Sequence, residues 1–459
     1  MTTVGGEQEP FAAPAEVPRL DASRARQVRK VAARERARHP SGDPVMHEPS
    51  RPSRRAFLRF LAGSPLWSLL GVPACMRPEP GGGDGPGGLL ASPDDAINVL
   101  DFQAMARAVL PPAHYGYLAT GVDGDETLRA NREGFTRFDL RPRRLVDVST
   151  IDMSVELLGE RWDTPIVLAP VGSQRAFHAE GELAVARAAD ARGHHQILST
   201  VTTTSVEDVN AVRRRPVWYQ LYPTSSWDVT QALIRRAEGA GCRALVLTVD
   251  LPVGSNRETL ERFIRRDTRD CTQCHDAAPP SDDPMSFPTG WLERKPMFSG
   301  LDMSHVLFDT PAMTWDFISR LKDTTDMRVL VKGIVRGDDA QRCVQSGADG
   351  VIVSNHGGRA NAGGRSTIES LPEVVDALRG RIPVLVDSGF RRGSDILKAM
   401  ALGADAVCIG RPYLWGLAAF GQQGVERVLD ILRAELRIAM QLHGVPRLGA
   451  IDRSFVAAG

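Results

Sequence analysis

The feature that most constrains the fold of this chain is the regular alternation of short apolar runs with amphipathic stretches from residue 95 onward. Short apolar runs bounded by polar residues or glycine are typical of buried strands, and the stretches between them have helical periodicity. The expected strands are Pro165–Ala169, Gln196–Ser199, Val217–Leu221, Ala244–Val249, Val329–Val331, Gly350–Ser354, Pro383–Val386 and Ala406–Ile409. The expected helices include Gly181–Arg192, Trp227–Ala240, Gly337–Ser346, Ser370–Leu378, Gly393–Leu402 and Gly424–Leu442.

Eight consecutive β-α units favour a closed (β/α)8 barrel. An open doubly wound sheet is the alternative, but it is expected to carry a Gly-x-Gly-x-x-Gly turn after its first strand, and no such turn is present. We therefore predict an α/β protein whose barrel domain spans residues 95–459. Residues 253–311, after the fourth strand, are rich in Pro, Asp and Ser and are too long for a plain connection, so we expect an insertion over the barrel mouth.

The composition narrows the functional classes. Lys plus Arg and Asp plus Glu both number 56, and a formal net charge of zero argues against bulk nucleic-acid binding. No run of eighteen or more apolar residues occurs, which excludes an integral multi-span protein. The apolar fraction of 42% is that of a soluble globular protein, and six cysteines in 459 residues are no disulfide scaffold.

The residues before the barrel have a different composition. Residues 1–45 are rich in Arg, Ala, Pro and Glu and are expected to be disordered. Residues 46–76 contain Arg54-Arg55 before a short apolar stretch, which resembles a twin-arginine export signal; a basic tail with a chance arginine pair is the alternative. Residues 77–94 form a linker rich in Gly and Pro. We therefore expect a periplasmic or otherwise exported protein, or a cytoplasmic one if the signal interpretation is wrong.

Two residues refine this interpretation. Met46 lies just upstream of the arginine pair, and we hypothesise that it is the true start and that residues 1–45 are not translated. Cys75 ends the run Val72-Pro73-Ala74-Cys75, which resembles a lipoprotein cleavage box and would provide membrane anchoring through a lipid. Because Pro73 is unusual there, ordinary signal cleavage, or none, stays open.

Polar or flexible residues follow nearly every expected strand, whereas the strand bodies consist of Val, Ile, Leu and Ala. In a (β/α)8 barrel the functional residues lie at the carboxyl ends of the strands. A single strand-end Asp is more often a helix cap, but eight ends that direct polar groups into one mouth predict a site. These residues are Pro170, Val171, Gly172, Ser199, Gln220, Tyr222, Thr248, Asp250, Lys332, His356, Arg359, Asp387, Gly410 and Arg411.

The sixth expected strand ends in the run Ser354-Asn355-His356-Gly357-Gly358-Arg359. This run places a base, two glycines and a guanidinium directly after a buried strand. A proton acceptor three residues from a guanidinium that can bind a carboxylate is what the oxidation of a 2-hydroxy acid requires.

The chain from Asn98 to its C-terminus resembles the FMN-dependent 2-hydroxy-acid oxidase and dehydrogenase family, which includes glycolate oxidase, lactate oxidase and the lactate and mandelate dehydrogenases. The resemblance implies a barrel with an N-terminal helical segment, FMN as cofactor, and oxidation of an L-2-hydroxy acid to the 2-oxo acid. The motifs that carry it are Tyr117-Leu118-Ala119-Thr120-Gly121, Leu168-Ala169-Pro170, Gln220-Leu221-Tyr222, Thr248-Val249-Asp250, Val331-Lys332-Gly333, Ser354 to Arg359, Asp387 to Gly393, and Ile409-Gly410-Arg411-Pro412.

The resemblance implies catalytic roles for His356, Asp250, Tyr222, Arg359, Arg257 and Tyr117. His356 would accept a proton from the substrate, and Asp250 would orient its ring and stabilise its cationic form. Arg359 and Arg257 would clamp the substrate carboxylate, and the two tyrosines would hydrogen-bond the substrate. A buried structural histidine and a solvated loop arginine are the alternatives for His356 and Arg257.

The resemblance also implies which residues hold the FMN. Lys332 would lie beside the N1–C2 carbonyl edge of the ring and stabilise its reduced form. Hydrogen bonds to the ring would come from Ser199, Gln220 and Thr248, and Asp387 would bind ribityl hydroxyls. The remaining contacts would come from Pro170, Val171, Gly172 and Ser354 around the ring and from Arg391, Gly410 and Arg411 at the phosphate.

This chain departs from the family pattern at several positions near the expected site. Val201 stands where glycolate oxidases carry Trp, so the wall on the substrate side is smaller. Asp387-Ser388-Gly389 replaces a Gly-Gly pair, and Ala360 to Arg365 replaces Gln-Leu-Asp. Gly172 stands where oxidases of the family often have Ala, which leans towards dehydrogenase behaviour.

The insertion contains Cys271-Thr272-Gln273-Cys274-His275, the attachment pattern of haem c. A haem would give the flavin an electron exit other than oxygen, and the periplasm is where such haem is attached. No cytochrome-sized domain surrounds the motif, so a disulfide between Cys271 and Cys274, a small metal site with His275, or no special role stays open. Cys242, Cys343 and Cys408 lie in strand or helix patterns and are expected to be buried.

Two other functions fit parts of the sequence. Another phosphate-binding flavin barrel, such as a type 2 isopentenyl diphosphate isomerase, would share the fold, but its chemistry has no need of the arginine clamp. A non-catalytic or electron-transfer flavin protein is the alternative from another class, because Val201 and Ala360 to Arg365 are altered. The resemblance further implies a homo-oligomer and leaves the electron acceptor open between a cytochrome, a quinone and oxygen.

Overall fold

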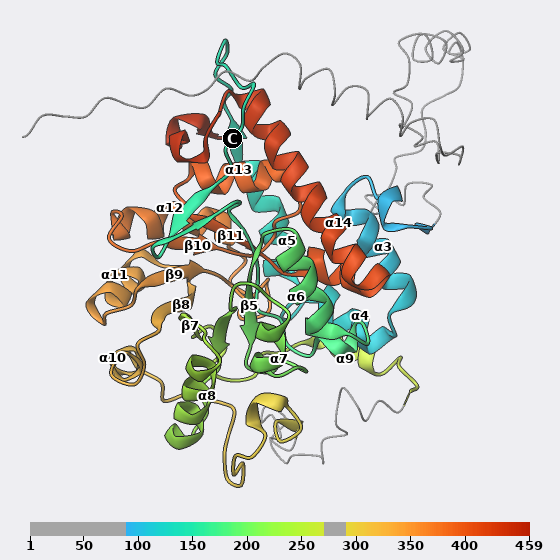
Figure 1. Ribbon diagram of the computed structural model, residues 1–459, viewed down its shortest axis with the longest axis vertical. Helices are drawn as coiled ribbons and strands as arrows, with labels where there is room; N and C mark the ends of the chain where they lie inside the picture. Colours follow the sequence, from blue (N-terminus) through green and yellow to red (C-terminus); the bar gives the residue numbers. More distant parts are fainter. Residues whose placement is uncertain (1–88, 270–290) are drawn as a thin grey trace, which may run out of the picture. The chain divides into compact units, whose positions relative to one another are not determined.

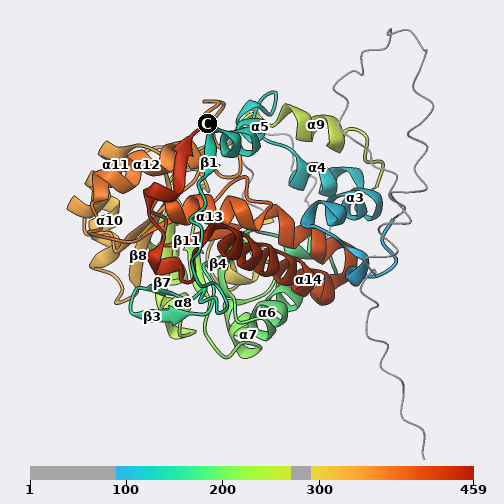
Figure 2. The ribbon, with the colours of Figure 1, turned by 90° about the horizontal axis from the view of Figure 1, so that it is seen from above.

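The computed structural model describes residues 89–269 and 291–459, and these belong to one compact unit, residues 84–459. Eight parallel strands close into a barrel in the order β10-β11-β4-β5-β6-β7-β8-β9. All eight strands predicted from the sequence are present, so the predicted (β/α)8 barrel is confirmed (Figures 1 and 2). The strands are β4 (Ile166–Leu168), β5 (His195–Ser199), β6 (Trp218–Leu221), β7 (Ala244–Thr248), β8 (Arg328–Ile334), β9 (Gly350–Val353), β10 (Val384–Val386) and β11 (Ala406–Ile409).

One helix of the surrounding layer follows each strand of the barrel. Six of these helices were predicted, whereas α7 and α10 are too short, at six and seven residues, to leave a clear periodicity in the sequence. The helices are α6 (Gly181–Ala191), α7 (Val206–Ala211), α8 (Trp227–Gly239), α10 (Asp316–Lys322), α11 (Gly337–Gln345), α12 (Thr367–Leu378), α13 (Gly393–Ala401) and α14 (Arg411–His443).

Local sequence signals fix where these helices begin and end. Ser366 and Glu369 form a capping box at the start of α12, which satisfies backbone N–H groups that have no partner within the helix. Gly444 ends α14 in a left-handed conformation, with φ of +68°. The predicted helix over Gly424–Leu442 corresponds to the part of α14 that follows a kink at Phe420 and Gly421, two residues with non-helical backbone angles, whereas the part from Arg411 to the kink was not predicted.

An N-terminal helical segment of α3 (Val99–Val109), α4 (Pro112–Ala119) and α5 (Glu126–Glu133) packs beside the barrel (Figure 2). The ring of Phe102 in α3 contacts Phe420 at the kink of α14, with 6.2 Å between the ring centroids. From the predicted insertion 253–311, α9 (Glu258–Ile264) packs against α4, and the ring of Phe263 contacts that of Tyr115. The insertion therefore contributes ordered structure next to the helix that carries Tyr117.

Two antiparallel pairs were not predicted. In the first, β2 (Val155–Leu157) pairs with β3 (Glu160–Trp162) at the end of the barrel where the strands begin. There Trp162 stacks on His195, the first residue of β5, at a centroid distance of 4.6 Å. In the second, β1 (Phe138–Leu140) pairs with β12 (Val456–Ala458), which brings together segments more than 300 residues apart in the sequence.

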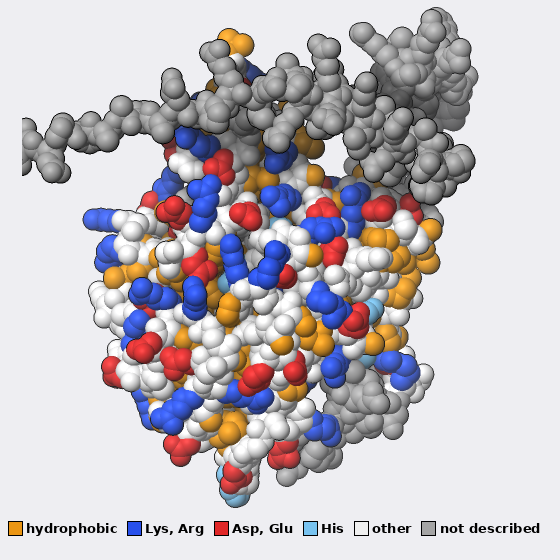
Figure 3. Space-filling model, in the orientation of Figure 1, with side chains coloured by type: hydrophobic (Ala, Val, Ile, Leu, Met, Phe, Trp, Pro, Cys, Tyr) orange, Lys and Arg blue, Asp and Glu red, His pale blue; other side chains and the backbone are white. Residues whose placement is uncertain are grey.

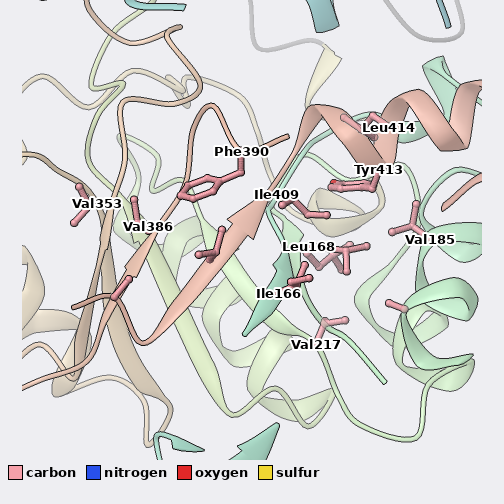
Figure 4. Close-up of a cluster of buried hydrophobic side chains, with 14 of the residues drawn as sticks. Ile166, Leu168, Val185, Val217, Val353, Val386, Phe390, Ile409, Tyr413 and Leu414 are labelled. Atoms are coloured by element: carbon pink, nitrogen blue, oxygen red, sulfur yellow. The ribbon is translucent and has the colours of Figure 1, made fainter. Parts of the chain in front are cut away.

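The core consists of two layers of buried apolar side chains, because alternate residues of each short strand point to opposite sides. Val167, Ile197 and Val246 face the interior of the barrel, whereas Ile166 and Leu168 pack against the helices. Figure 4 shows the outer layer around β11, where Ile409, Tyr413 and Leu414 lie near Ile166 and Leu168. Every residue of β4, β5, β6, β7, β9, β10 and β11 is buried, so the strand ends are held rigidly.

The surface visible in Figure 3 carries basic and acidic side chains interspersed with one another, in agreement with the zero net charge. Among the described residues, no helix is both long and apolar enough to cross a membrane.

Candidate functional site

The carboxyl ends of the barrel strands open into one cavity. Most of the predicted site residues line this cavity, so the expectation that polar strand ends gather in one mouth is confirmed. The lining residues among them are Tyr117, Pro170, Val171, Gly172, Ser199, Tyr222, Lys332, His356, Arg359, Asp387, Arg391, Gly410 and Arg411.

His356 lies at the centre of a hydrogen-bonded chain of three residues. Its Nδ1 donates to Oδ1 of Asp250, which follows β7, over 2.8 Å. Its Nε2 lies 3.1 Å from the hydroxyl of Tyr222, which follows β6. Because the Asp250 carboxylate can only accept a proton at Nδ1, the neutral ring keeps its lone pair at Nε2, on the side of the cavity.

The charges around these three hydrogen-bonded residues suit a base that takes up and releases a proton. Burial lowers the pKa of His356 and outweighs the attraction of Asp250, and the nearby Lys332 charge lowers it further. Burial alone would raise the pKa of Asp250, but the charge of Lys332 and the hydrogen bond from His356 hold it at about 2. His356 is therefore neutral before the reaction. Asp250 is ionised throughout and can stabilise the protonated form of His356.

Lys332, in β8, lies between two carboxylates below the cavity. Its Nζ is 3.4 Å from Oδ2 of Asp250 and 3.7 Å from Oδ2 of Asp387. Burial opposes the charged form of Lys332, yet the two carboxylates raise its pKa above the usual value. The lysine is thus a fixed positive charge at the cavity wall, 3% exposed.

Arg359, which follows β9, and Tyr117, in α4, line the cavity next to each other. The guanidinium of Arg359 lies over the ring of Tyr117, 4.1 Å from its centroid. Burial would raise the pKa of Tyr117, but the charges of Arg359 and Arg257 lower it. Within the described part of the chain, Arg359 forms no ion pair with a carboxylate, so this cation faces the cavity without its usual partner.

Arg257 does not line the cavity. Its Nε donates to the carbonyl of Gly121 over 2.9 Å, and another guanidinium nitrogen donates to the Thr120 hydroxyl over 3.0 Å. Its guanidinium lies 5.9 Å from the centroid of the Tyr117 ring. Burial, and next the charge of Arg359, lower the pKa of Arg257. The two predicted clamp residues therefore both lie near the Tyr117 ring, and Arg257 is hydrogen-bonded to the 117–121 segment.

Ser199, Gln220 and Thr248 form a polar row along three adjacent strand ends. The Ser199 hydroxyl donates to Oε1 of Gln220, whose Nε2 donates to the Thr248 hydroxyl, both over 3.0 Å. Gln220 and Thr248 lie behind the cavity lining rather than in it. On the neighbouring strand end, a side chain at Gly172 would collide with Val201, so the wall there is made of backbone.

Two arginines follow the last two strands of the barrel, of which Arg391 is buried and Arg411 is partly buried. Arg391 lies against the ring of Trp415 and donates to the carbonyl of Phe390 over 2.7 Å. Arg411 donates to the carbonyl oxygens of Gly357 and Thr120 over 2.8 and 3.1 Å. Burial lowers the pKa of both arginines. No carboxylate within the described ranges forms an ion pair with either guanidinium, and buried cations of this kind require an anion.

These features together fit a phosphate-bearing flavin. The polar row and Lys332 provide donors for the edge of a heteroaromatic ring, the backbone at Gly172 allows a flat ring to approach, and Arg391 and Arg411 suit a phosphate. A phosphate site after the seventh and eighth strands is a recurrent feature of such barrels. The fold and the cavity thus define a barrel oxidoreductase with a nucleotide cofactor.

The structure also shows polar anchors of the His356 turn that the sequence did not reveal. The amide side chains of Asn131, from α5, and Asn355 exchange two hydrogen bonds of 2.9 and 2.8 Å. The hydroxyl of Ser388 accepts from the backbone N–H of Gly357 over 3.0 Å. Asn131 lies 224 residues from Asn355 in the sequence, so no local pattern could have paired them.

Several predictions fall elsewhere. Cys271, Cys274 and His275 lie outside the described residues, as do Cys75 and the whole signal segment. Cys242, Cys343 and Cys408 are buried free thiols, as predicted. Within the described ranges, no three His, Cys, Asp or Glu side chains are arranged to hold a metal ion.

Comparison with known proteins agrees with this class. The family model of FMN-dependent dehydrogenases matches residues 106–458. An L-lactate oxidase from Nostoc is 41% identical over 376 residues, which are 78% of this chain and 98% of the relative. The human 2-hydroxyacid oxidase 1 is 38% identical over 368 residues, 78% of this chain and 96% of that protein.

Solved structures give the same result. A mandelate oxidase in complex with (S)-2-phenylpropionate superposes with a TM-score of 0.66 at 39% identity and covers 77% of this chain and 96% of its own. A soluble mutant of the membrane-associated (S)-mandelate dehydrogenase from Pseudomonas putida has a TM-score of 0.70 at 35% identity, over 80% of this chain and all of the other. The chain belongs to the family of FMN-dependent dehydrogenases, and the prediction of FMN as its cofactor is confirmed.

Proposed function

We propose that this protein oxidises an L-2-hydroxy acid to the 2-oxo acid, with His356 as the base and with Arg359 and Arg257 as the carboxylate clamp. The reaction class is that of its relatives at about 40% identity, which are oxidases of lactate and other 2-hydroxy acids. The observation that carries the residue roles is the placement of His356. Its Nδ1 is hydrogen-bonded to Asp250, and the rest of its ring lines the same cavity as Arg359.

His356 can take up the proton that leaves the substrate. Nε2 carries the lone pair, and Tyr222 is hydrogen-bonded to this nitrogen, so the tyrosine marks where a substrate hydroxyl would bind. Protonation makes the ring cationic, and the ionised Asp250 stabilises that charge over a hydrogen bond of 2.8 Å. When bound, FMN supplies the two-electron acceptor for the oxidation at C2 of the substrate.

The carboxylate of the substrate would bind at Arg359. The guanidinium presents a planar pair of donors that matches a carboxylate, and it is held in place by the Tyr117 ring at 4.1 Å. Arg257 lies 5.9 Å from the centroid of the same ring, and its positive charge raises the local attraction for an anion. The two arginines repel one another when no anion is bound, which favours binding of a substrate with one carboxylate.

The cofactor would be held along the other walls. Lys332 would place its fixed charge at the ring edge, next to the row formed by Ser199 and Gln220. Asp387, which lines the cavity and accepts from the Ser354 hydroxyl over 2.9 Å, would bind the ribityl chain. Arg391 and Arg411 would bind the phosphate, which supplies the anion that these buried cations lack.

The size of the substrate is set at Val201. The residue lies in the cavity wall where a larger aromatic side chain would reduce the space, and its methyl groups fill the position next to Gly172. We therefore propose that the enzyme accepts 2-hydroxy acids with larger side chains than glycolate. Gly172 favours a dehydrogenase, whose electron acceptor would be a cytochrome or quinone, with oxygen as the alternative.

Anaerobic mixing of the purified holoenzyme with a panel of 2-hydroxy acids tests the proposal. The panel includes glycolate, L-lactate and (S)-mandelate, with D-lactate and (R)-mandelate as matched controls. Bleaching of the flavin absorbance by at least one L or S member, and by neither control, is expected. A flavin that none of the acids reduces would identify a non-catalytic flavin protein, the alternative left by the sequence.

The remaining proposals rest on the sequence alone. We propose export through the twin-arginine segment at residues 46–76, with lipid attachment at Cys75, and a homo-oligomeric state. Fractionation of cells that produce the full chain tests the first two, since a Cys75→Ala variant should leave the membrane fraction if the lipid is the anchor. Haem attachment at Cys271 and Cys274 predicts a Soret band that survives denaturation, and a purified exported form without that band refutes it.

A further inference from the structure

We propose that Ser388 is a positioning residue for the base, and that its hydroxyl holds the turn on which His356 lies. The inference rests on the proposed role of His356. Ser388 follows β10 and Asp387, whereas His356 follows β9, so the contact joins the ends of two adjacent strands. Neither the family match nor the sequence assigned a function to this serine.

The backbone of Ser388 is the first observation. Its φ is +79°, in the left-handed region that L side chains rarely adopt, and the next residue, Gly389, has φ of +90°. A non-glycine residue held there carries a strain on the order of 1–3 kcal/mol. Glycine would adopt the same turn without that strain. We therefore infer that the serine side chain makes an interaction that offsets the strain.

The hydroxyl is the second observation. It donates to Oδ1 of Asp387 over 2.6 Å and accepts from the backbone N–H of Gly357 over 3.0 Å. The other oxygen of Asp387 accepts from the Ser354 hydroxyl over 2.9 Å, and that hydroxyl accepts the N–H of His356 over 3.1 Å. The backbone N–H groups of His356 and Gly357 are thus both connected to the Asp387 carboxylate, each through one serine hydroxyl.

The turn needs such anchors because it is itself strained. His356 has φ of +58°, Gly357 +69° and Gly358 +79°, so three successive residues have positive φ. Loss of the Ser388 hydroxyl would leave the Gly357 N–H without its partner and would let the imidazole move relative to Asp250. Asp387 also lies 3.7 Å from Lys332, so the same hydroxyl ties the base turn to the fixed charge at the ring edge.

Two substitutions separate the hydroxyl from the strain. Ser388→Gly removes the hydroxyl and the strain together, whereas Ser388→Ala removes the hydroxyl and keeps the strain. We expect kcat to fall about tenfold in both variants at saturating FMN, which is equivalent to about 1.4 kcal/mol. The KM should change little, and a substrate deuterated at C2 should show a larger kinetic isotope effect. The apparent melting temperature should be kept or raised in Ser388→Gly and lowered in Ser388→Ala.

Leu145→Gly is the control variant. It relieves a positive φ of 58° at an exposed position outside the cavity and should change stability without changing kcat.

A readout on the apoprotein makes the test independent of turnover. Acylation of His356 by diethyl pyrocarbonate, followed by peptide mass spectrometry, should be several-fold faster in both Ser388 variants, because the ring is less firmly held. A kcat equal to that of the unaltered enzyme in Ser388→Gly, or a loss of kcat that only follows loss of FMN or of stability, overturns the inference. His356→Gln separates the two proposals: if this variant keeps full activity, the proposed function itself fails, whatever the Ser388 variants do.

Discussion

Replacing Asp250 with Asn is the perturbation that tests the electrostatics of the base most sharply. The substitution keeps the shape of the side chain but removes the carboxylate that accepts from Nδ1 of His356 over 2.8 Å. At an effective dielectric constant of about 20, two unit charges about 4 Å apart attract by about 4 kcal/mol. Loss of that attraction destabilises the protonated His356 in the transition state, which corresponds to a fall in rate of about a thousandfold.

A second effect has the same sign. An Asn amide at position 250 can donate a hydrogen bond to Nδ1, which would place the proton of the neutral ring on Nε2 and remove the lone pair from the cavity. The pKa of His356, already lowered by burial, would fall further without Asp250. Lys332 would keep Asp387 as its only carboxylate neighbour, 3.7 Å away.

The assay is the rate of anaerobic flavin reduction in a stopped-flow instrument, with the fastest substrate of the panel. Asp349→Asn is the matched control, because Asp349 forms an ion pair of 2.6 Å with Lys322 at the opposite end of the barrel. Both variants should lose some stability, but only Asp250→Asn should lose the reduction rate. A flavin reduction rate of Asp250→Asn within about threefold of that of the unaltered enzyme would refute the assignment of this pair. Such a rate corresponds to a barrier change of less than about 1 kcal/mol, against the expected change of about 4 kcal/mol.

Three further predictions follow from the same geometry. Arg359→Lys should raise KM by about tenfold or more, since an ammonium cannot bind a carboxylate in bidentate fashion; steady-state kinetics with the R336K variant as a surface control checks this. Arg391→Ala should weaken FMN binding to the apoprotein by about tenfold to a hundredfold, the value of a charge-assisted hydrogen bond, as measured by quenching of flavin fluorescence. Burial lowers the pKa of His195 to about 3, so its neutral form contributes stability above the unfolded pKa of 6.5 that is lost as the pH falls towards 3. Between pH 7 and pH 4.5, the free energy of unfolding in urea should therefore fall by about 2.5 kcal/mol less in His195→Phe than in the unaltered protein, and an equal fall in both contradicts the prediction.

The barrel could be predicted from the sequence because each strand is short, apolar and followed by a glycine or polar residue. The carboxyl ends of such strands meet at one mouth, so the residues that follow them, such as Lys332 and His356, could be placed together from their positions in the sequence. The pairing of His356 with Asp250 came from the family resemblance, and the structure brings the two within 2.8 Å.

Long-range contacts between irregular segments could not be predicted. Asn131 reaches Asn355 across 224 residues, and β1 pairs with β12 near the C-terminus. Neither contact leaves a periodic signal, because both depend on how the N-terminal segment packs on the finished barrel. The positive φ of Ser388 was invisible for a different reason: a serine after a strand usually adopts an ordinary conformation, and only the backbone reveals the strain.

Arg257 illustrates the limit of transferring a role by spacing. The family resemblance placed it beside Arg359, and both guanidinium groups do lie near the Tyr117 ring. Its guanidinium, however, donates to the backbone of the 117–121 segment rather than lining the cavity. The direction of a side chain follows from its packing and hydrogen bonds, which spacing along the sequence does not determine.

The central claim is that His356 removes a proton from a 2-hydroxy acid while FMN accepts its electrons. The most direct measurement compares anaerobic flavin bleaching by the same L-2-hydroxy acid in the unaltered holoenzyme and in His356→Gln, each loaded with FMN to the same extent. We predict rapid bleaching with stoichiometric 2-oxo acid in the first and a rate lower by at least a thousandfold in the second. Equal rates in the two proteins would contradict the account.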